Sequence, residues 1–229
     1  MDAFDFSKKA VLWDLDDTLH SRAEAARKMF PGMFRECLYE GRSDAFIDEA
    51  ADFMMTQRWR HSVTHEGAFR ALLARYPSDK PYVQQECRDY YYAHIRDYVA
   101  PFPETVEIIQ KLRARGIKQA IVTNITPDLL DHQKKKVEAL GIAPYFDAIV
   151  YSAEVGIRKP DRRIFDHAAA LLGVANEDCL FVGDDPDTDI VGALAAGMVA
   201  VWLDQSSDDR FSGNPHVCKV SSAADFFVL

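Results

Sequence analysis

Residues 10–19 read AVLWDLDDTL, a short apolar run that passes directly into acidic residues. The apolar part, Ala10–Leu15, has the length and composition of a strand that is buried on both faces. Four more runs of this kind follow in the second half of the chain. They are Gln119–Thr123, Ala148–Tyr151, Leu180–Gly183 and Val199–Leu203. Repeated short runs of this type predict a buried, parallel β-sheet.

Segments with helical spacing lie between the last four runs. Thr126 and Pro127 supply a helix cap and a first-turn proline, and Gly141 closes that segment. Pro160 is expected to open another helix, which Gly173 ends. Because strands and helices alternate, we expect right-handed crossovers and a doubly wound, Rossmann-like α/β core with helices on both faces of the sheet.

The stretch from His20 to about Val99 interrupts this alternation, since it contains several helical patterns and no convincing buried strand. Ser21 and Glu24 form a capping-box pattern, and Ser43 or Asp44 can cap a second helix. The sequence therefore predicts an all-helical cap domain, residues 21–99, inserted into a core domain of residues 1–20 and 100–229. Two prolines in residues 99–103 suit a semi-rigid hinge.

Composition limits the possible partners. The 229 residues carry 27 Lys and Arg against 36 Asp and Glu, a net charge of −9, which argues against a nucleic-acid partner. Hydrophobic residues make up 48%, so a folded core is expected and not a disordered chain. No export signal or membrane-spanning run is recognised, and the four scattered cysteines suggest reduced thiols. We expect a cytoplasmic protein without a membrane partner; the sequence leaves its oligomeric state open.

Candidate functional residues follow the predicted strands. In open parallel sheets, ligands bind outside the carboxyl ends of the strands, so these positions are where a site is expected. The candidates come from four separate segments: Asp14, Asp16 and Thr18; Thr123 and Asn124; Lys159; and Asp184 with Asp189.

The carboxylates of Asp14, Asp16 and Asp184 would repel one another if they were brought together without a cation. Oxygen ligands of this kind suit Mg²⁺, which usually also coordinates a substrate phosphate. Thr123 and Lys159 would add a hydroxyl donor and a fixed positive charge, which bound phosphoryl oxygens need. The residues therefore indicate phosphoryl transfer.

The same residues resemble the four motifs of the haloacid dehalogenase-like (HAD) superfamily, and they occur in the family's order. The motifs are Asp14-Leu-Asp16-Asp-Thr-Leu19, Thr123, Gly156-Ile-Arg-Lys159-Pro-Asp161, and Val182-Gly-Asp184-Asp-Pro-Asp-Thr-Asp189-Ile-Val-Gly-Ala193. The resemblance covers residues 8–20 and 101–205, and the helical insertion has the position and length of the family's helical cap. Arg162 departs from the pattern, because relatives often have proline there.

The resemblance implies a role for each matching residue. Asp14 would be the nucleophile and Asp16 the general acid and base. Mg²⁺ would be held by Asp14, Asp184 and the backbone carbonyl of Asp16. The remaining residues would bind phosphoryl oxygens or support the metal: Thr123, Asn124 and Lys159 for the former, Asp189 and Thr18 for the latter.

These roles predict a phosphatase that acts on a small phosphorylated metabolite, with a mobile cap that closes over the site. A phosphomutase with the same core chemistry and a catalytically silent, phospho-ligand-binding relative are the alternatives. A dehalogenase would leave Asp16 and Asp184 without a role. A receiver domain is rejected because its phosphorylated Asp follows a later strand. In the insertion, the cationic and aromatic run of residues 58–61, with His65, is a weaker candidate for contacting an anionic substrate.

Overall fold

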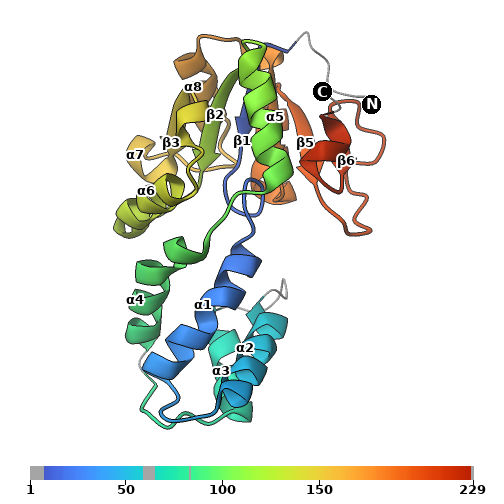
Figure 1. The fold of residues 1–229 in the computed structure, drawn as a ribbon. Helices are drawn as coiled ribbons and strands as arrows, with labels where there is room; N and C mark the ends of the chain where they lie inside the picture. Colours follow the sequence, from blue (N-terminus) through green and yellow to red (C-terminus); the bar gives the residue numbers. More distant parts are fainter. Residues whose placement is uncertain (1–7, 59–64, 83, 228–229) are drawn as a thin grey trace. The chain divides into compact units, whose positions relative to one another are not determined.

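The computed structural model of the chain describes residues 8–58, 65–82 and 84–227, and it divides into two compact units (Figure 1). The core unit comprises Met1–Ser21 and Ala100–Leu229, and the helical unit comprises Arg22–Val99. Within the described residues, no helix combines the length and the apolar character that crossing a membrane requires.

The core unit is built on a six-stranded parallel sheet with the strand order β3-β2-β1-β4-β5-β6. Its strands are β1 (Ala10–Trp13), β2 (Lys118–Thr123), β3 (Ala148–Tyr151), β4 (Cys179–Gly183), β5 (Val199–Leu203) and β6 (Val217–Val220). Strand β1 lies in the middle of the sheet. Strands β2 and β3 are added on one side of it, and β4, β5 and β6 on the other. The predicted doubly wound fold is therefore confirmed. Strand β6 was not predicted, because its half-buried residues do not form an apolar run.

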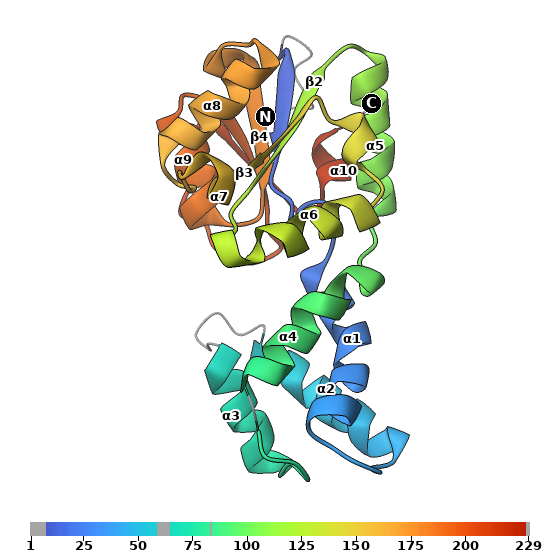
Figure 2. The same ribbon diagram turned by 90° about the vertical axis from the view of Figure 1, so that its left-hand side faces the viewer.

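Helices cover both faces of this sheet (Figure 2). They are α5 (Pro103–Ala114), α6 (Leu130–Ala139), α7 (Ser152–Val155), α8 (Arg162–Leu172), α9 (Val191–Ala195) and α10 (Ala223–Phe226). Leu12, Val122 and Phe181 point to one face and share a buried cluster with α8 and α9. On the other face, the side chain of Gln119 donates to a carbonyl of α5, and Trp13 stacks on Phe227 beside α10.

Helix α8 begins two residues later than predicted. The carboxylate of Asp161 accepts a hydrogen bond from the backbone of Arg163 at 3.0 Å and so caps the helix. Lys159 and Pro160, joined by a cis peptide bond, therefore belong to the preceding loop. A Cβ atom at Gly192 would collide with the ring of Phe165, so this glycine allows α9 to approach α8 closely.

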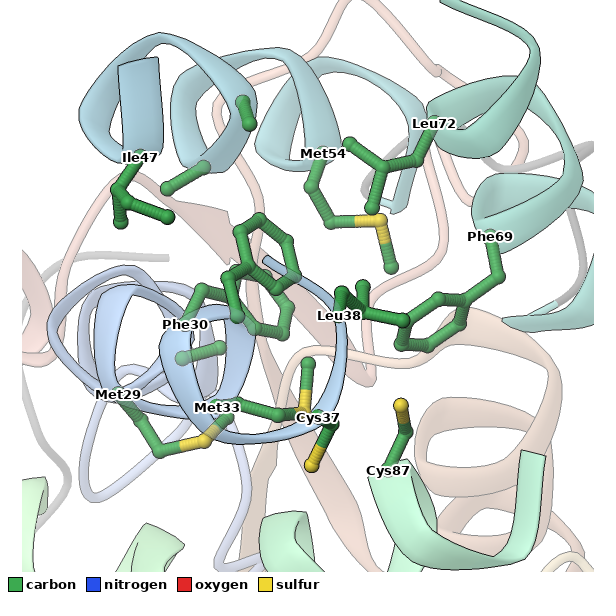
Figure 3. Close-up of a cluster of buried hydrophobic side chains, with 14 of the residues drawn as sticks. Met29, Phe30, Met33, Cys37, Leu38, Ile47, Met54, Phe69, Leu72 and Cys87 are labelled. Carbon is green, nitrogen blue, oxygen red and sulfur yellow. The ribbon is translucent and has the colours of Figure 1, made fainter. Parts of the chain in front are cut away.

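The helical unit has its own apolar core (Figure 3). The helices of this unit are α1 (Arg22–Cys37), α2 (Asp44–Arg58), α3 (His65–Arg75) and α4 (Gln84–His94), followed by a 3₁₀ turn, Ile95–Tyr98. Within this core Phe34 is fully buried, stacked on Phe30 and edge-on to Tyr39. Ser43 accepts a hydrogen bond from the backbone of Phe46 at 3.3 Å, which confirms the predicted cap of α2.

Candidate active site

The carboxyl ends of the two central strands carry the acidic residues. Asp14 follows β1, and its backbone nitrogen donates to the carbonyl of Val182 at 2.8 Å. Asp184 follows β4 and leads into a π-helical turn, Pro186–Ile190, which contains Asp189. A Cβ atom at Gly183 would collide with the carboxylate of Asp189. Glycine at the end of β4 therefore allows Asp189 to fold back against the strand end.

Three carboxylates meet at this edge of the sheet. Asp14, Asp184 and Asp189 each offer an oxygen, and these oxygens lie within 4.8 Å of one another. Lys159 approaches the group from the loop before α8: its Nζ lies 2.5 Å from Oδ1 of Asp14 and 2.6 Å from Oδ1 of Asp189. Asp14, Asp189 and Lys159 are buried, and Asp184 is half-buried.

The charges of this group do not cancel. Burial alone would lower the pKa of Lys159, but the carboxylates of Asp14 and Asp189 more than offset that effect and raise it. Burial raises the pKa of Asp189, and Asp14 raises it further, while Lys159 opposes both. Three carboxylates against one ammonium group leave an excess of negative charge, and their oxygens are close together. This donor set fits a hard divalent cation such as Mg²⁺.

Thr18 and Asn124 contact members of this group, and Thr123 lies at the end of the neighbouring strand β2. Thr123 ends β2, is buried, and its hydroxyl accepts a hydrogen bond from Gln133 at 2.9 Å. Thr18 is buried, and its hydroxyl donates to Asp184 at 3.5 Å. Asn124 exchanges two hydrogen bonds with the backbone of Lys159, at 2.9 and 3.0 Å. The amide of Asn124 thus holds the lysine loop in place.

The carboxylate of Asp16 is held by a different set of partners. Its Oδ1 lies 2.8 Å from Nε2 of His20 and 2.5 Å from Nζ of Lys136, and its Oδ2 accepts a hydrogen bond from Gln133 at 3.2 Å. The turn that follows has Asp17 in the left-handed region at φ 65° and a hydrogen bond from its nitrogen to the carbonyl of His20. The structure therefore gathers Asp14, Asp184, Asp189 and Lys159 in one group and places the Asp16 carboxylate in a neighbouring one.

Three residues of this second group were not among the predicted site residues: His20, Gln133 and Lys136. His20 lies four residues after Asp16 in an irregular turn, so no periodic pattern relates the two. Gln133 and Lys136 are three positions apart on α6 and therefore share one face of the helix. That spacing was the available signal, but Lys136 ends a run of three lysines that looks solvent-exposed. The weaker candidates of the insertion, the side chains of residues 58–61 and His65, lie outside the described residues.

The sequence pattern of the haloacid dehalogenase-like hydrolase family matches residues 8–197. A phosphoserine phosphatase of Thermus thermophilus is 31% identical, and the alignment covers 86% of this chain and 89% of the relative. A glyceraldehyde 3-phosphate phosphatase of Methanopyrus kandleri is 33% identical, with 85% and 83% covered. Among solved structures, the magnesium-bound HAD-hydrolase YfnB of Bacillus subtilis superposes with a TM-score of 0.68 at 20% identity, covering 94% of this chain and 95% of that one.

Proposed function

The chain belongs to the haloacid dehalogenase-like hydrolase family and is a phosphatase, and we propose that it hydrolyses its phosphorylated metabolite through an Mg²⁺-supported aspartyl-phosphate intermediate. The observation that carries this proposal is the convergence of Asp14, Asp184 and Asp189 at the carboxyl edge of the sheet, with Lys159 paired to Asp14 and Asp189. A structural ion pair has no need of a third carboxylate close to the first two, whereas phosphoryl transfer uses such a charged, preorganised site.

Asp14 is the proposed nucleophile. One of its carboxylate oxygens forms a bond to phosphorus while the bond between phosphorus and the leaving alcohol oxygen breaks. Lys159 lies 2.5 Å from Asp14, so its ammonium group lowers the repulsion between that carboxylate and an anionic substrate. The hydroxyl of Thr123 and the ammonium of Lys159 are the proposed donors to the phosphoryl oxygens.

Asp16 is the proposed general acid and base. In the first step it gives a proton to the departing alcohol oxygen, and in the second it takes a proton from the water that attacks the phosphorus of the intermediate. That attack breaks the bond between Asp14 and phosphorus and releases inorganic phosphate. The Asp14 carboxylate and the protonated Asp16 are then restored for the next cycle.

The proposed ligands of Mg²⁺ are the carboxylates of Asp14 and Asp184 and the backbone carbonyl of Asp16, with Asp189 and Thr18 supporting them. When bound, the ion would neutralise charge on the phosphoryl oxygens. Asn124, which was expected to contact substrate, is better supported as a residue that fixes the Lys159 loop, because both ends of its amide are bonded to that backbone.

The proposed substrate is a small phosphorylated metabolite, and the helical unit is the proposed cap. Two relatives that match most of the chain are named for small substrates, phosphoserine and glyceraldehyde 3-phosphate. A cap that closes over a site excludes bulk water and limits the size of the substrate. We therefore expect phosphoproteins to be rejected.

The test is phosphate release from a panel of phosphoserine, glyceraldehyde 3-phosphate, sugar phosphates, nucleoside monophosphates, phosphoglycolate and p-nitrophenyl phosphate. Activity should require Mg²⁺, disappear with EDTA, and fall at least about 10⁴-fold in Asp14→Asn, as expected when a nucleophile is lost. Asp187→Asn is the matched control, because Asp187 is exposed and paired with Arg210. Phosphate release that survives Asp14→Asn would refute the assignment.

A further inference from the structure

Asp16 is surrounded by donors to an unusual degree for a carboxylate at the end of a strand. His20 and Lys136 both contact Oδ1, and Gln133 donates to Oδ2, so both oxygens are engaged. His20 and Lys136 are buried, and the Asp16 side chain is only 20% exposed. Each donor removes rotational freedom from the carboxylate, so together the three define one orientation for it.

Helix α6 supplies two of these donors from its inward face. Lys134, Lys135 and Lys136 are consecutive, but the first two side chains are 43% and 45% exposed and pair with Glu154 and Asp131. The side chain of Lys136 is 10% exposed and pairs with Asp16. A lysine that is largely removed from water needs a partner to offset its desolvation, and Asp16 provides one. Lys136 is therefore not part of the solvated face that its neighbours form.

Gln133 connects this group to the proposed phosphoryl site. Its side-chain nitrogen donates both to Thr123, at 2.9 Å, and to Oδ2 of Asp16, at 3.2 Å. A single amide nitrogen thus bridges the carboxylate of Asp16 and the hydroxyl that is proposed to bind a phosphoryl oxygen. The orientation that Lys136, His20 and Gln133 impose therefore keeps Asp16 beside that site.

Holding His20 beside Asp16 costs free energy in two ways. Because the carboxylate oxygen accepts, Nε2 of His20 carries the hydrogen of this contact. The other ring nitrogen, Nδ1, is buried and has no hydrogen-bond partner among the described residues. The turn that brings His20 back also holds Asp17 at φ 65°, a region that residues other than glycine seldom adopt. Such costs persist where the surrounding structure requires the arrangement.

We propose that Lys136 and His20 are positioning residues for proton transfer by Asp16, with Gln133 tying the orientation of the carboxylate to Thr123. This inference rests on the proposed role of Asp16 as general acid and base. Proton transfer requires the acid to lie within hydrogen-bond reach of the leaving oxygen, and a misplacement of about 1 Å can cost about 10²-fold in rate. Neither residue needs to contact the substrate to have this effect.

The test compares leaving groups. Lys136→Met should lower kcat/KM about 10- to 100-fold for the best alkyl phosphate of the panel, whose alkoxide needs a proton, and much less for p-nitrophenyl phosphate. The inhibition constant of inorganic phosphate should stay within about twofold, because Lys159 and Thr123 are untouched. Lys135→Met is the matched control and should change none of these values. His20→Phe should show the same selectivity, and it keeps the proposal testable if Lys136→Met does not fold.

A double-mutant cycle shows whether Lys136 acts through Asp16. In an Asp16→Asn background, Lys136→Met should cause no further loss on the alkyl phosphate, whereas independent structural effects would multiply. If Asp16→Asn itself slows both leaving groups equally, the proposed role of Asp16 fails. If Asp16→Asn is selective but Lys136→Met and His20→Phe slow both substrates equally, or the losses multiply, the positioning role alone is overturned.

Discussion

The core unit buries charged side chains at one edge of its sheet, among them Asp14, Asp189, Lys136 and Lys159, together with His20. The buried side chains described in the helical unit are apolar, aromatic or cysteine. Removing charged groups from water costs free energy that packing alone does not return, so a fold optimised for stability would avoid them. This contrast indicates that the sheet edge is arranged for chemistry, while the helical unit is stabilised mainly by apolar packing.

The largest expected effect is at the buried charges. Lys159→Met should lower kcat about 10²- to 10³-fold, because it removes a donor to the phosphoryl group. It should also destabilise the native state by about 3–5 kcal/mol, since Asp14 and Asp189 lose a buried partner. Mg²⁺ should restore part of that stability, because a cation that binds the native state alone stabilises it.

Denaturant unfolding with and without Mg²⁺, alongside steady-state kinetics, measures both effects of Lys159→Met. Lys134→Met is the control, because Lys134 is far more exposed and pairs with Glu154. A Lys159→Met protein with kcat within twofold of the wild type would contradict the account of the sheet edge.

The next effect should be on stability alone. Phe34→Ala removes a fully buried ring from the core of the helical unit and should cost about 3–5 kcal/mol. Hydrogen exchange should become faster in α1 to α4. Where the protein is still folded, the inhibition constant of inorganic phosphate should not change, because the proposed phosphate-binding residues belong to the core unit. A large change in that constant would mean that the contrast between the units is overstated.

The smallest effect is expected at Tyr39, and it should depend on pH. The hydroxyl of Tyr39 donates to the carbonyl of Tyr76 at 2.8 Å, so Tyr39→Phe should cost about 1 kcal/mol at pH 8. Burial raises the pKa of Tyr39 from 10.0 to about 12. The native state therefore holds this proton more tightly than the unfolded state does, and the resulting stability is complete below pH 10 and lost as the pH rises through 12.

Unfolding measurements at several pH values test this expectation for Tyr39→Phe. The stability difference between wild type and variant should shrink between pH 10 and 12, with kcat at pH 8 unchanged. A difference that stays constant over this range would show that Tyr39 does not titrate in the native protein as expected.

The fold, and the meeting of acidic residues at one edge of the sheet, could be predicted because they depend on local patterns. Short apolar runs identify buried strands, and the carboxyl ends of parallel strands necessarily meet at one edge, which is why Asp14 and Asp184 were expected to lie close together. Strand β6 was not predicted, because it lies at the edge of the sheet, where a strand is only partly buried and needs no apolar run. The start of α8 was misplaced because Asp161 caps the helix, so that it begins at Arg162 and not at Pro160.

The second group of residues could not be predicted for a different reason. Whether Lys136 faces solvent or Asp16 depends on how α6 is rotated against the sheet, and three consecutive lysines give no sign of that rotation. His20 reaches Asp16 through an irregular turn with Asp17 at positive φ, a conformation that cannot be predicted from the residue type. The hydrogen bonds of Asn124 to the backbone of Lys159 could not be predicted either, since they depend on the path of the loop.

The central claim is that Asp14 receives the phosphoryl group at a metal site at the carboxyl edge of the sheet. A crystal structure of the protein with Mg²⁺ and beryllofluoride, a mimic of the phosphoryl group, tests it most directly. The account predicts beryllium bonded to a carboxylate oxygen of Asp14, fluorines contacting Thr123 and Lys159, and Mg²⁺ bound by Asp14 and Asp184. Beryllofluoride on another residue, or Mg²⁺ bound away from Asp14 and Asp184, would contradict it.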